Sequence, residues 1–142
     1  MYVIMDANDF ERDLNDAQEL MSNEKYQDAL IILGKLKEAD KAGNFDYKLT
    51  HKLYQLISNS QSLYNQQKVL STIQKISQNQ KSISFPKLMV ILKEQENLDL
   101  DVQILRREVE ILILRSLLEA KIEGKDLVFK VVSNSILKRL ET

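Results

Sequence analysis

The side chains that most often do chemistry in proteins are scarce in this sequence. It holds one histidine, His51, and no cysteine. A zinc hydrolase needs several histidines and a carboxylate on one metal ion, and a single histidine cannot supply that set. Without cysteine there is no thiolate nucleophile or thiolate metal site, and no serine stands in a G-x-S-x-G turn. The sequence therefore favours a protein that is not an enzyme and uses no metal or cofactor.

Three further patterns resemble ligand sites, and each has a simpler interpretation. Gly124-Lys125 lacks the upstream glycine and the following Ser or Thr of a phosphate loop, so we predict a hairpin turn there. The segment Asp6-Ala-Asn8-Asp9 begins like a calcium loop but lacks the glycine at the sixth position, which favours a helix cap. Close carboxylates are interpreted as solvated groups at helix ends: Glu94 with Glu96, Asp99 with Asp101, and Glu108 with Glu110.

Composition limits the class of protein. A chain of 142 residues makes one domain or two small ones, and 44% hydrophobic with 29% charged residues is ordinary for a globular protein. Three glycines and one proline favour long helices, and a net charge of −1 argues against a polyanion as the main partner. No apolar run approaches the ~18 residues of a membrane span, and the short apolar start does not fit a signal peptide. We expect a soluble intracellular protein of the cytoplasm, the nucleus or both.

The first 65 residues predict a helical-repeat region of two antiparallel helix pairs. The first helix is expected from residue 6 or 8 to about 22, and the second from 24 to 42. Gly43 then takes the left-handed conformation of a helix C-terminus. A third helix from residue 44 or 46 to 57 is expected to end at Ser58-Asn-Ser60, and a fourth continues to residue 76. Gly34 lies inside the second helix, where either the close approach of another helix or chance explains it.

Residues 66–142 predict the element order of a winged helix. Ile83 alternates with serines as in a very short strand, and Pro86 suits the first turn of a helix. After a turn at residues 97–101, a long helix is expected over 101–121. A hairpin turn at 123–126 leads into a β-rich segment, 127–132, and a last helix follows to residue 140. The predicted fold is mainly α, with a short antiparallel helical-repeat region followed by a winged helix with a small β-hairpin.

Two parts of the chain resemble known families. The segment Asn23-Glu-Lys-Tyr26-Gln-Asp-Ala29-Leu30 resembles the second half of a tetratricopeptide-type repeat. The C-terminal part resembles the second half of a PCI domain, the module shared by the proteasome lid, the signalosome and translation initiation factor three. Four segments carry this resemblance: Gln67–Ile76, Ile83–Leu88, Val102–Ile113 and Leu117–Lys125.

Within that family, residues 82–132 are most similar to a signalosome subunit. Family members usually continue with Ile/Leu-Asp-Gln after the Gly-Lys pair, whereas Asp126-Leu127-Val128 follows here. The resemblance implies that the last repeat helix, residues 66–75, doubles as the first helix of the winged helix. It also implies a non-catalytic scaffold role in a multiprotein complex.

The helix expected over residues 101–121 bears on function, because a winged helix would read DNA with it. Its charges cancel, with Asp101, Glu108, Glu110 and Glu119 against Arg106, Arg107, Arg115 and Lys121. Successive residues advance about 100° around a helix, so the four apolar residues 111–114 cover nearly its full circumference. Such a helix is either completely buried in the protein's own core or partly covered by a partner.

The function predicted from these observations is a scaffold or adaptor subunit that binds other protein subunits through the edges of its sheet and an apolar helix. The candidate partner-binding residues are Ile83, Leu114, Leu118, Leu127, Val128, Phe129, Ile136 and Leu140. The alternative is a small winged-helix transcriptional regulator that binds nucleic acid through Arg106, Arg107, Lys121, Lys125 and Lys130, with Lys138 and Arg139 nearby. A third interpretation is a homodimer formed through the apolar helix.

Overall fold

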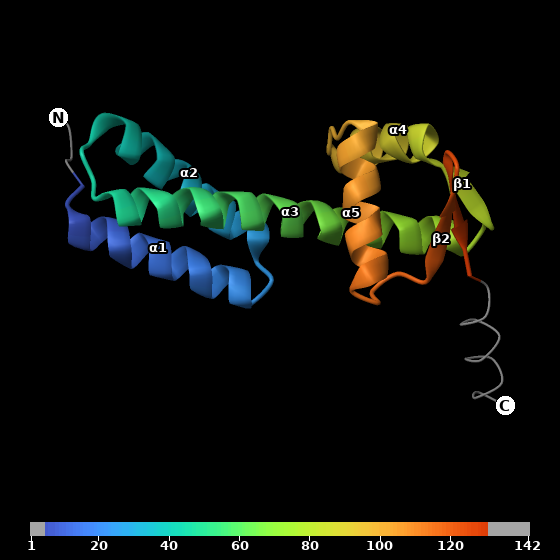
Figure 1. Cartoon of the computed structure of the whole chain (residues 1–142), viewed down its shortest axis with the longest axis horizontal. Coiled ribbons are helices and arrows are strands. Elements are labelled where there is room, and N and C mark those ends of the chain that lie inside the picture. Colours follow the sequence, from blue (N-terminus) through green and yellow to red (C-terminus); the bar gives the residue numbers. More distant parts are fainter. Residues whose placement is uncertain (1–4, 131–142) are drawn as a thin grey trace, which may run out of the picture. The chain divides into compact units, whose positions relative to one another are not determined.

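The computed structural model describes residues 5–130. Within them the chain is mainly helical, with five helices and a three-stranded antiparallel sheet that resembles the hairpin of a winged helix (Figure 1). It forms two compact units, residues 1–64 and 65–142. The sequence placed a division one residue later, between 65 and 66. The last helix predicted from the sequence lies outside the described residues, and so do Ile136 and Leu140.

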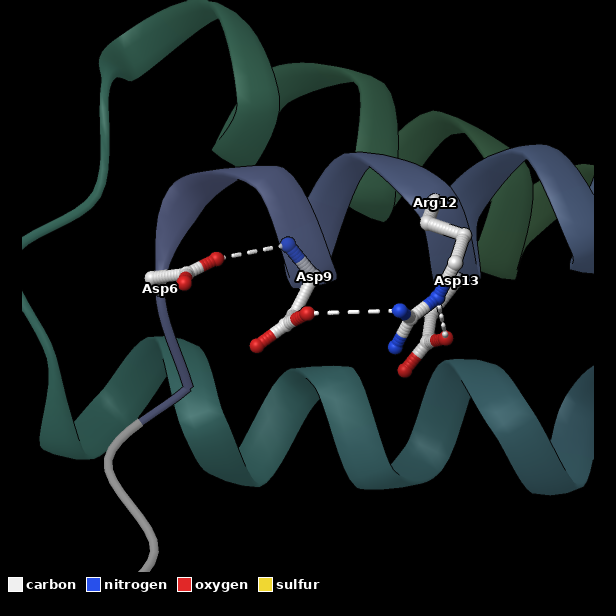
Figure 2. A network of polar contacts seen from close by, with 4 residues as sticks. All are labelled: Asp6, Asp9, Arg12 and Asp13. Atoms are coloured by element: carbon white, nitrogen blue, oxygen red, sulfur yellow. Dashed lines mark hydrogen bonds and ion pairs between the residues drawn. The ribbon is translucent and has the colours of Figure 1, made fainter.

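The first unit begins with α1 (Ala7–Ser22), and its N-cap is Asp6. The Asp6 carboxylate accepts a hydrogen bond from the backbone N–H of Asp9 at 2.8 Å, which confirms that this segment caps a helix. One turn further along, the Arg12 guanidinium forms ion pairs with Asp9 at 3.3 Å and Asp13 at 3.6 Å (Figure 2). The acidic side chains at this end of α1 therefore serve the helix itself.

A short connection turns the chain back along α1 into α2 (Tyr26–Ala42) (Figure 1). Apolar residues at helical spacing face one another across the two helices and the start of α3 (Tyr47–Ser77). Phe45 closes one end of this core, with its ring centroid 4.4 Å from that of Phe10. The buried core residues are Phe10, Leu14, Ala17, Ala29, Leu33, Leu36, Leu53 and Leu56.

The predicted break at Ser58-Asn-Ser60 is wrong, because α3 is a single helix of 31 residues. Serine and asparagine lower helix propensity by only about 0.5–0.7 kcal/mol each relative to alanine, and neither removes a backbone donor. No glycine or proline occurs between Asn44 and Phe85 to end the helix. Leu53 and Leu56 are buried in the first unit, and Val69 and Ile73 are buried in the second. Ser60, in the predicted break, is buried as well, so the helix is packed along this segment and not only at its ends.

The second unit contains the end of α3, strand β1 (Ser82–Ser84) and helix α4 (Phe85–Glu96), followed by α5 (Val102–Leu114) and strands β2 (Ala120–Glu123) and β3 (Asp126–Phe129). The helices begin where short polar side chains cap them. Ser84 accepts from the N–H of Lys87, and Asp101 accepts from the N–H of Ile104 at 2.8 Å. The sheet order is β1-β3-β2, and Ile83 pairs with Leu127 while Ile122 pairs with the same residue from the other side.

The turns differ from expectation at Gly43 and agree with it at Gly124. Gly43 is extended, with φ −111° and ψ 179°, so the predicted left-handed conformation there is wrong. Asn97 instead takes a left-handed conformation at the end of α4, with φ 53°. Gly124 has φ 62° in the two-residue turn between β2 and β3, which is the hairpin predicted for Gly124-Lys125.

Gly34 is not explained by a close helix, because a Cβ atom built there meets no heavy atom within 4 Å. We therefore expect Gly34→Ala to raise the free energy of unfolding by about 0.5–1 kcal/mol, since alanine lowers the backbone entropy of the unfolded chain and favours the helix. Urea denaturation monitored by circular dichroism measures this change.

The matched substitution Gly43→Ala is expected to act in the opposite direction. Its Cβ would lie 2.6 Å from the Cε2 atom of Phe45, whose ring is packed on Phe10. Equal effects of the two substitutions would contradict this description of the first unit.

Candidate functional site

The end of α5 is fixed by the turn that follows it. The predicted helix over residues 101–121 is too long, because α5 ends at Leu114 and residues 120–123 form β2. Ser116 takes a left-handed conformation with φ 60°, and the N–H groups of Leu117 and Leu118 both donate to the Leu112 carbonyl. The Arg115 guanidinium donates to the Gln66 side-chain oxygen at 2.7 Å, which anchors the end of α5 to α3.

This turn leaves two large apolar side chains in solvent. Of the four apolar residues that encircle the helix, Leu112 is buried, Ile111 and Ile113 are half-buried, and Leu114 is 83% exposed. Leu117, on the other side of the turn, is 47% exposed. We call Leu114 and Leu117 the leucine pair. Scattered exposed leucines are common, but these two lie only three residues apart, on either side of the left-handed Ser116.

A cleft of about 550 Å³ includes Leu117 in its wall. Leu118 and Phe129, both buried, supply apolar lining, and Leu70 of α3 is half-buried beside them. The other residues that line the cleft are mostly polar: Gln74, Ser77, Gln78, Asn79, Gln80, Lys81, Ser116, Glu119 and Lys130. Apolar side chains and amide groups in the wall of one cleft can receive an apolar side chain of a partner and hydrogen-bond its backbone.

Four more of the predicted partner-binding residues lie in the sheet of the second unit. Ile83, Leu127 and Phe129 are buried, and Val128 is half-buried. The strand that carries residues 127–129 was expected at an edge of the sheet, but β3 is the central strand and pairs on both sides. Its backbone groups are thus used within the sheet. Among the described residues, the edges are β1 and β2.

Three of the five cations predicted to bind nucleic acid form contacts within the protein. Arg106 donates to the Gly124 carbonyl at 2.9 Å, lies over the Phe85 ring at 5.6 Å and pairs with Glu110 at 3.5 Å. Arg107 pairs with Glu108 at 3.3 Å, and Lys121 pairs with Glu123 at 2.8 Å. Lys125 and Lys130 are exposed on and after the hairpin. Lys138 and Arg139 lie outside the described residues.

Two of the six carboxylates predicted to be solvated differ from that prediction. Glu108 was interpreted as solvated, yet its side chain is fully buried on α5, where Arg107 contacts it. Leu105 and Leu112 are buried three positions before and four positions after Glu108, and residues at this spacing share one face of a helix. Glu96 is partly buried between Lys68 and Lys75, at 3.8 and 3.9 Å. Glu94, Asp99, Asp101 and Glu110 are exposed as expected.

The cleft could not be read from the sequence, because it is assembled from distant segments. Leu70 and Gln74 come from α3, Ser116 to Glu119 from the turn after α5, and Phe129 from β3. The exposure of Leu117 follows from the left-handed Ser116, and no glycine or asparagine at this position signals that turn. His51 is exposed on α3 and stacks on Tyr47, with 6.1 Å between ring centroids.

Comparison with known proteins adds no assignment. No family model, no curated protein and no solved structure matches this chain. In the part of the chain from residue 5 to 130, no helix has the length and apolar character needed to cross a membrane. Over the same residues, no three His, Cys, Asp or Glu side chains gather closely enough to hold a metal ion.

The register of the sheet predicts different effects of proline in β3 and β2. Glu119 accepts from the N–H of Lys130, so hydrogen-bonded pairs recur every second residue, and the N–H of Val128 points toward Lys121. Val128→Pro removes that donor and leaves a carbonyl unpaired, at a cost of about 1–3 kcal/mol.

Ile122→Pro is the matched control, because the Ile122 N–H points away from β3. We expect a smaller loss of thermal stability for it than for Val128→Pro. The reverse order would show that β3 is not the central strand.

Arg106 is expected to stabilise the hairpin turn through its bond to the Gly124 carbonyl. Arg106→Ala should lower the free energy of unfolding by about 1 kcal/mol, because it removes a charge-assisted hydrogen bond and the contact with Phe85. Glu110→Gln removes only the exposed ion pair of the same arginine and should cost less than about 0.5 kcal/mol. Chemical denaturation of both variants measures the difference.

Proposed function

We propose that this protein is a non-catalytic scaffold or adaptor subunit that binds another protein at the leucine pair. The observation that carries the proposal is the exposure of Leu114 and Leu117 on one turn, with Leu117 in the wall of a cleft that Leu118 and Phe129 also line. The hydrogen bond between Arg115 and Gln66 holds this turn in place before a partner arrives. A turn that is already anchored loses less conformational entropy when its leucines are covered, which favours a stable contact.

The leucine pair and the cleft together have the composition expected of an interface. Leu114 and Leu117 supply apolar area, and the amide side chains of Gln74, Gln78 and Asn79 line the adjacent cleft. Protein interfaces commonly combine an apolar centre with a polar rim that forms hydrogen bonds. The resemblance of residues 66–132 to a PCI domain supports the same function, because that module joins subunits of large assemblies.

The test is a tagged purification from the native cell at ~0.3 M salt, where exposed charge pairs are well screened. We expect the wild-type chain to retain other subunits in a fixed ratio, identified by mass spectrometry. Leu114→Lys should reduce their recovery at least about tenfold, since a charge placed at the centre of an apolar contact costs more than ~1.4 kcal/mol.

Val90→Lys is the matched control, because Val90 is 48% exposed on α4, away from the turn that carries the leucine pair. It should leave recovery unchanged. A chain that retains no subunits in a fixed ratio, or retains nucleic acid only when the salt is lowered, contradicts the scaffold proposal. Binding that falls steeply with salt would favour the nucleic-acid alternative.

A further inference from the structure

The outer edge of β2 is a second surface, separate from the leucine pair. β2 lies at one end of the sheet order, and among residues 5–130 only β3 pairs with it. An edge strand of this kind carries backbone N–H and C=O groups that another strand can use. Natural edge strands are often protected by charged side chains, and β2 carries two: Lys121 and Glu123.

The register of the hairpin determines which groups face outward. Glu119 accepts from Lys130, and hydrogen-bonded pairs alternate with non-hydrogen-bonded pairs along an antiparallel ladder. Lys121 and Glu123 therefore exchange bonds with β3, whereas Ala120 and Ile122 form the non-hydrogen-bonded pairs. The N–H and C=O groups of Ile122 thus point away from β3, at the centre of the free edge.

We propose that β2 pairs with β2 of a second copy of this chain, antiparallel and centred on Ile122. A two-fold axis through this point lets each Ile122 N–H donate to the Ile122 carbonyl of the other copy. The two sheets then form one continuous sheet across the axis.

Charge complementarity supports this register. Centring the pair on Ile122 places Lys121 opposite Glu123 of the second copy, and Glu123 opposite its Lys121. These are non-hydrogen-bonded positions, where facing side chains lie closest and opposite charges stabilise the pair. Both side chains are exposed on the same face of the sheet, and they already contact each other within one chain at 2.8 Å.

Neighbouring registers lack this complementarity. A two-fold axis at Lys121 would place two lysines opposite each other, and an axis at Glu123 would oppose two glutamates. Like charges directly opposite are destabilising. The two charges of β2 therefore disfavour pairing centred on Lys121 or Glu123. The pairing centred on Ile122 is the one that they permit.

The test reverses charges in the full chain and measures the dissociation constant of the dimer by sedimentation equilibrium. Protein concentrations extend to about 1 mM, so that a weak dimer is also detected. Lys121→Glu and Glu123→Lys each oppose like charges at both positions and should raise the dissociation constant roughly tenfold. The double variant exchanges the two charges and should restore wild-type association. An equal mixture of the two single variants should form the heterodimer in preference to either homodimer.

Lys93→Glu is the matched control, because it makes the same change in net charge at an exposed position on α4. Its dissociation constant should equal that of the wild type. Since Lys121 and Glu123 are exposed, circular dichroism should show all variants to be as folded as the wild type. A wild-type chain that stays monomeric at the highest concentration, or single variants that associate as well as it does, overturns the proposal.

The absence of cysteine permits a direct measurement of register. When Lys121→Cys and Glu123→Cys chains are mixed, the proposed pairing brings the two sulfur atoms together, because facing Cβ atoms in such pairs lie about 4.5–5.5 Å apart. A mixed disulfide should form faster than either symmetric one. Faster formation of the symmetric Lys121→Cys disulfide would place the axis elsewhere. Neither the charge-reversal experiment nor the disulfide experiment involves Leu114. Their outcomes are therefore independent of the proposed function, which is tested by Leu114→Lys.

Discussion

The second unit depends on the double pairing of β3. This strand exchanges hydrogen bonds with β1, which precedes α4, and with β2, which follows α5. Segments more than forty residues apart in the sequence are thereby held side by side. Leu127 and Phe129 are two residues apart in β3 and therefore lie on the same face, which is buried in the core. The backbone of β3 forms hydrogen bonds to β1 on one side and to β2 on the other. The helices between the strands must then pack over that face.

The same pairing explains where α5 ends. Residues 120–123 are needed as a strand opposite β3, so the chain must leave the helix before them. It does so through a left-handed Ser116, with two N–H groups bonded to the Leu112 carbonyl. Leu118 and Ala120 return to the core, while Leu114 and Leu117 remain outside. The exposed leucine pair is thus a consequence of closing the sheet.

The charged residues of the second unit mostly stabilise its own structure. Arg106 joins α5 to the hairpin turn and to Phe85, and Arg115 joins the end of α5 to α3. A DNA-reading surface needs cations that reach phosphates, and these two arginines are directed to protein groups instead. Among the described residues, the leucine pair is exposed and β2 lies at an edge of the sheet. The charges of β2 restrict which strand can pair there.

The sequence by itself determined the identity of most elements. Helical spacing of apolar residues, Asp6 as a cap, Pro86 in a first helical turn and Gly124 in a hairpin turn are local signals, and local physics decides them. Tertiary structure decided the rest. It kept α3 continuous through a serine-rich segment, where Ser60 is buried, and it ended α5 early because β2 was required by the sheet. It also buried Glu108 and placed β3 at the centre. Each of these outcomes depends on contacts between residues far apart in the chain, which no local pattern encodes.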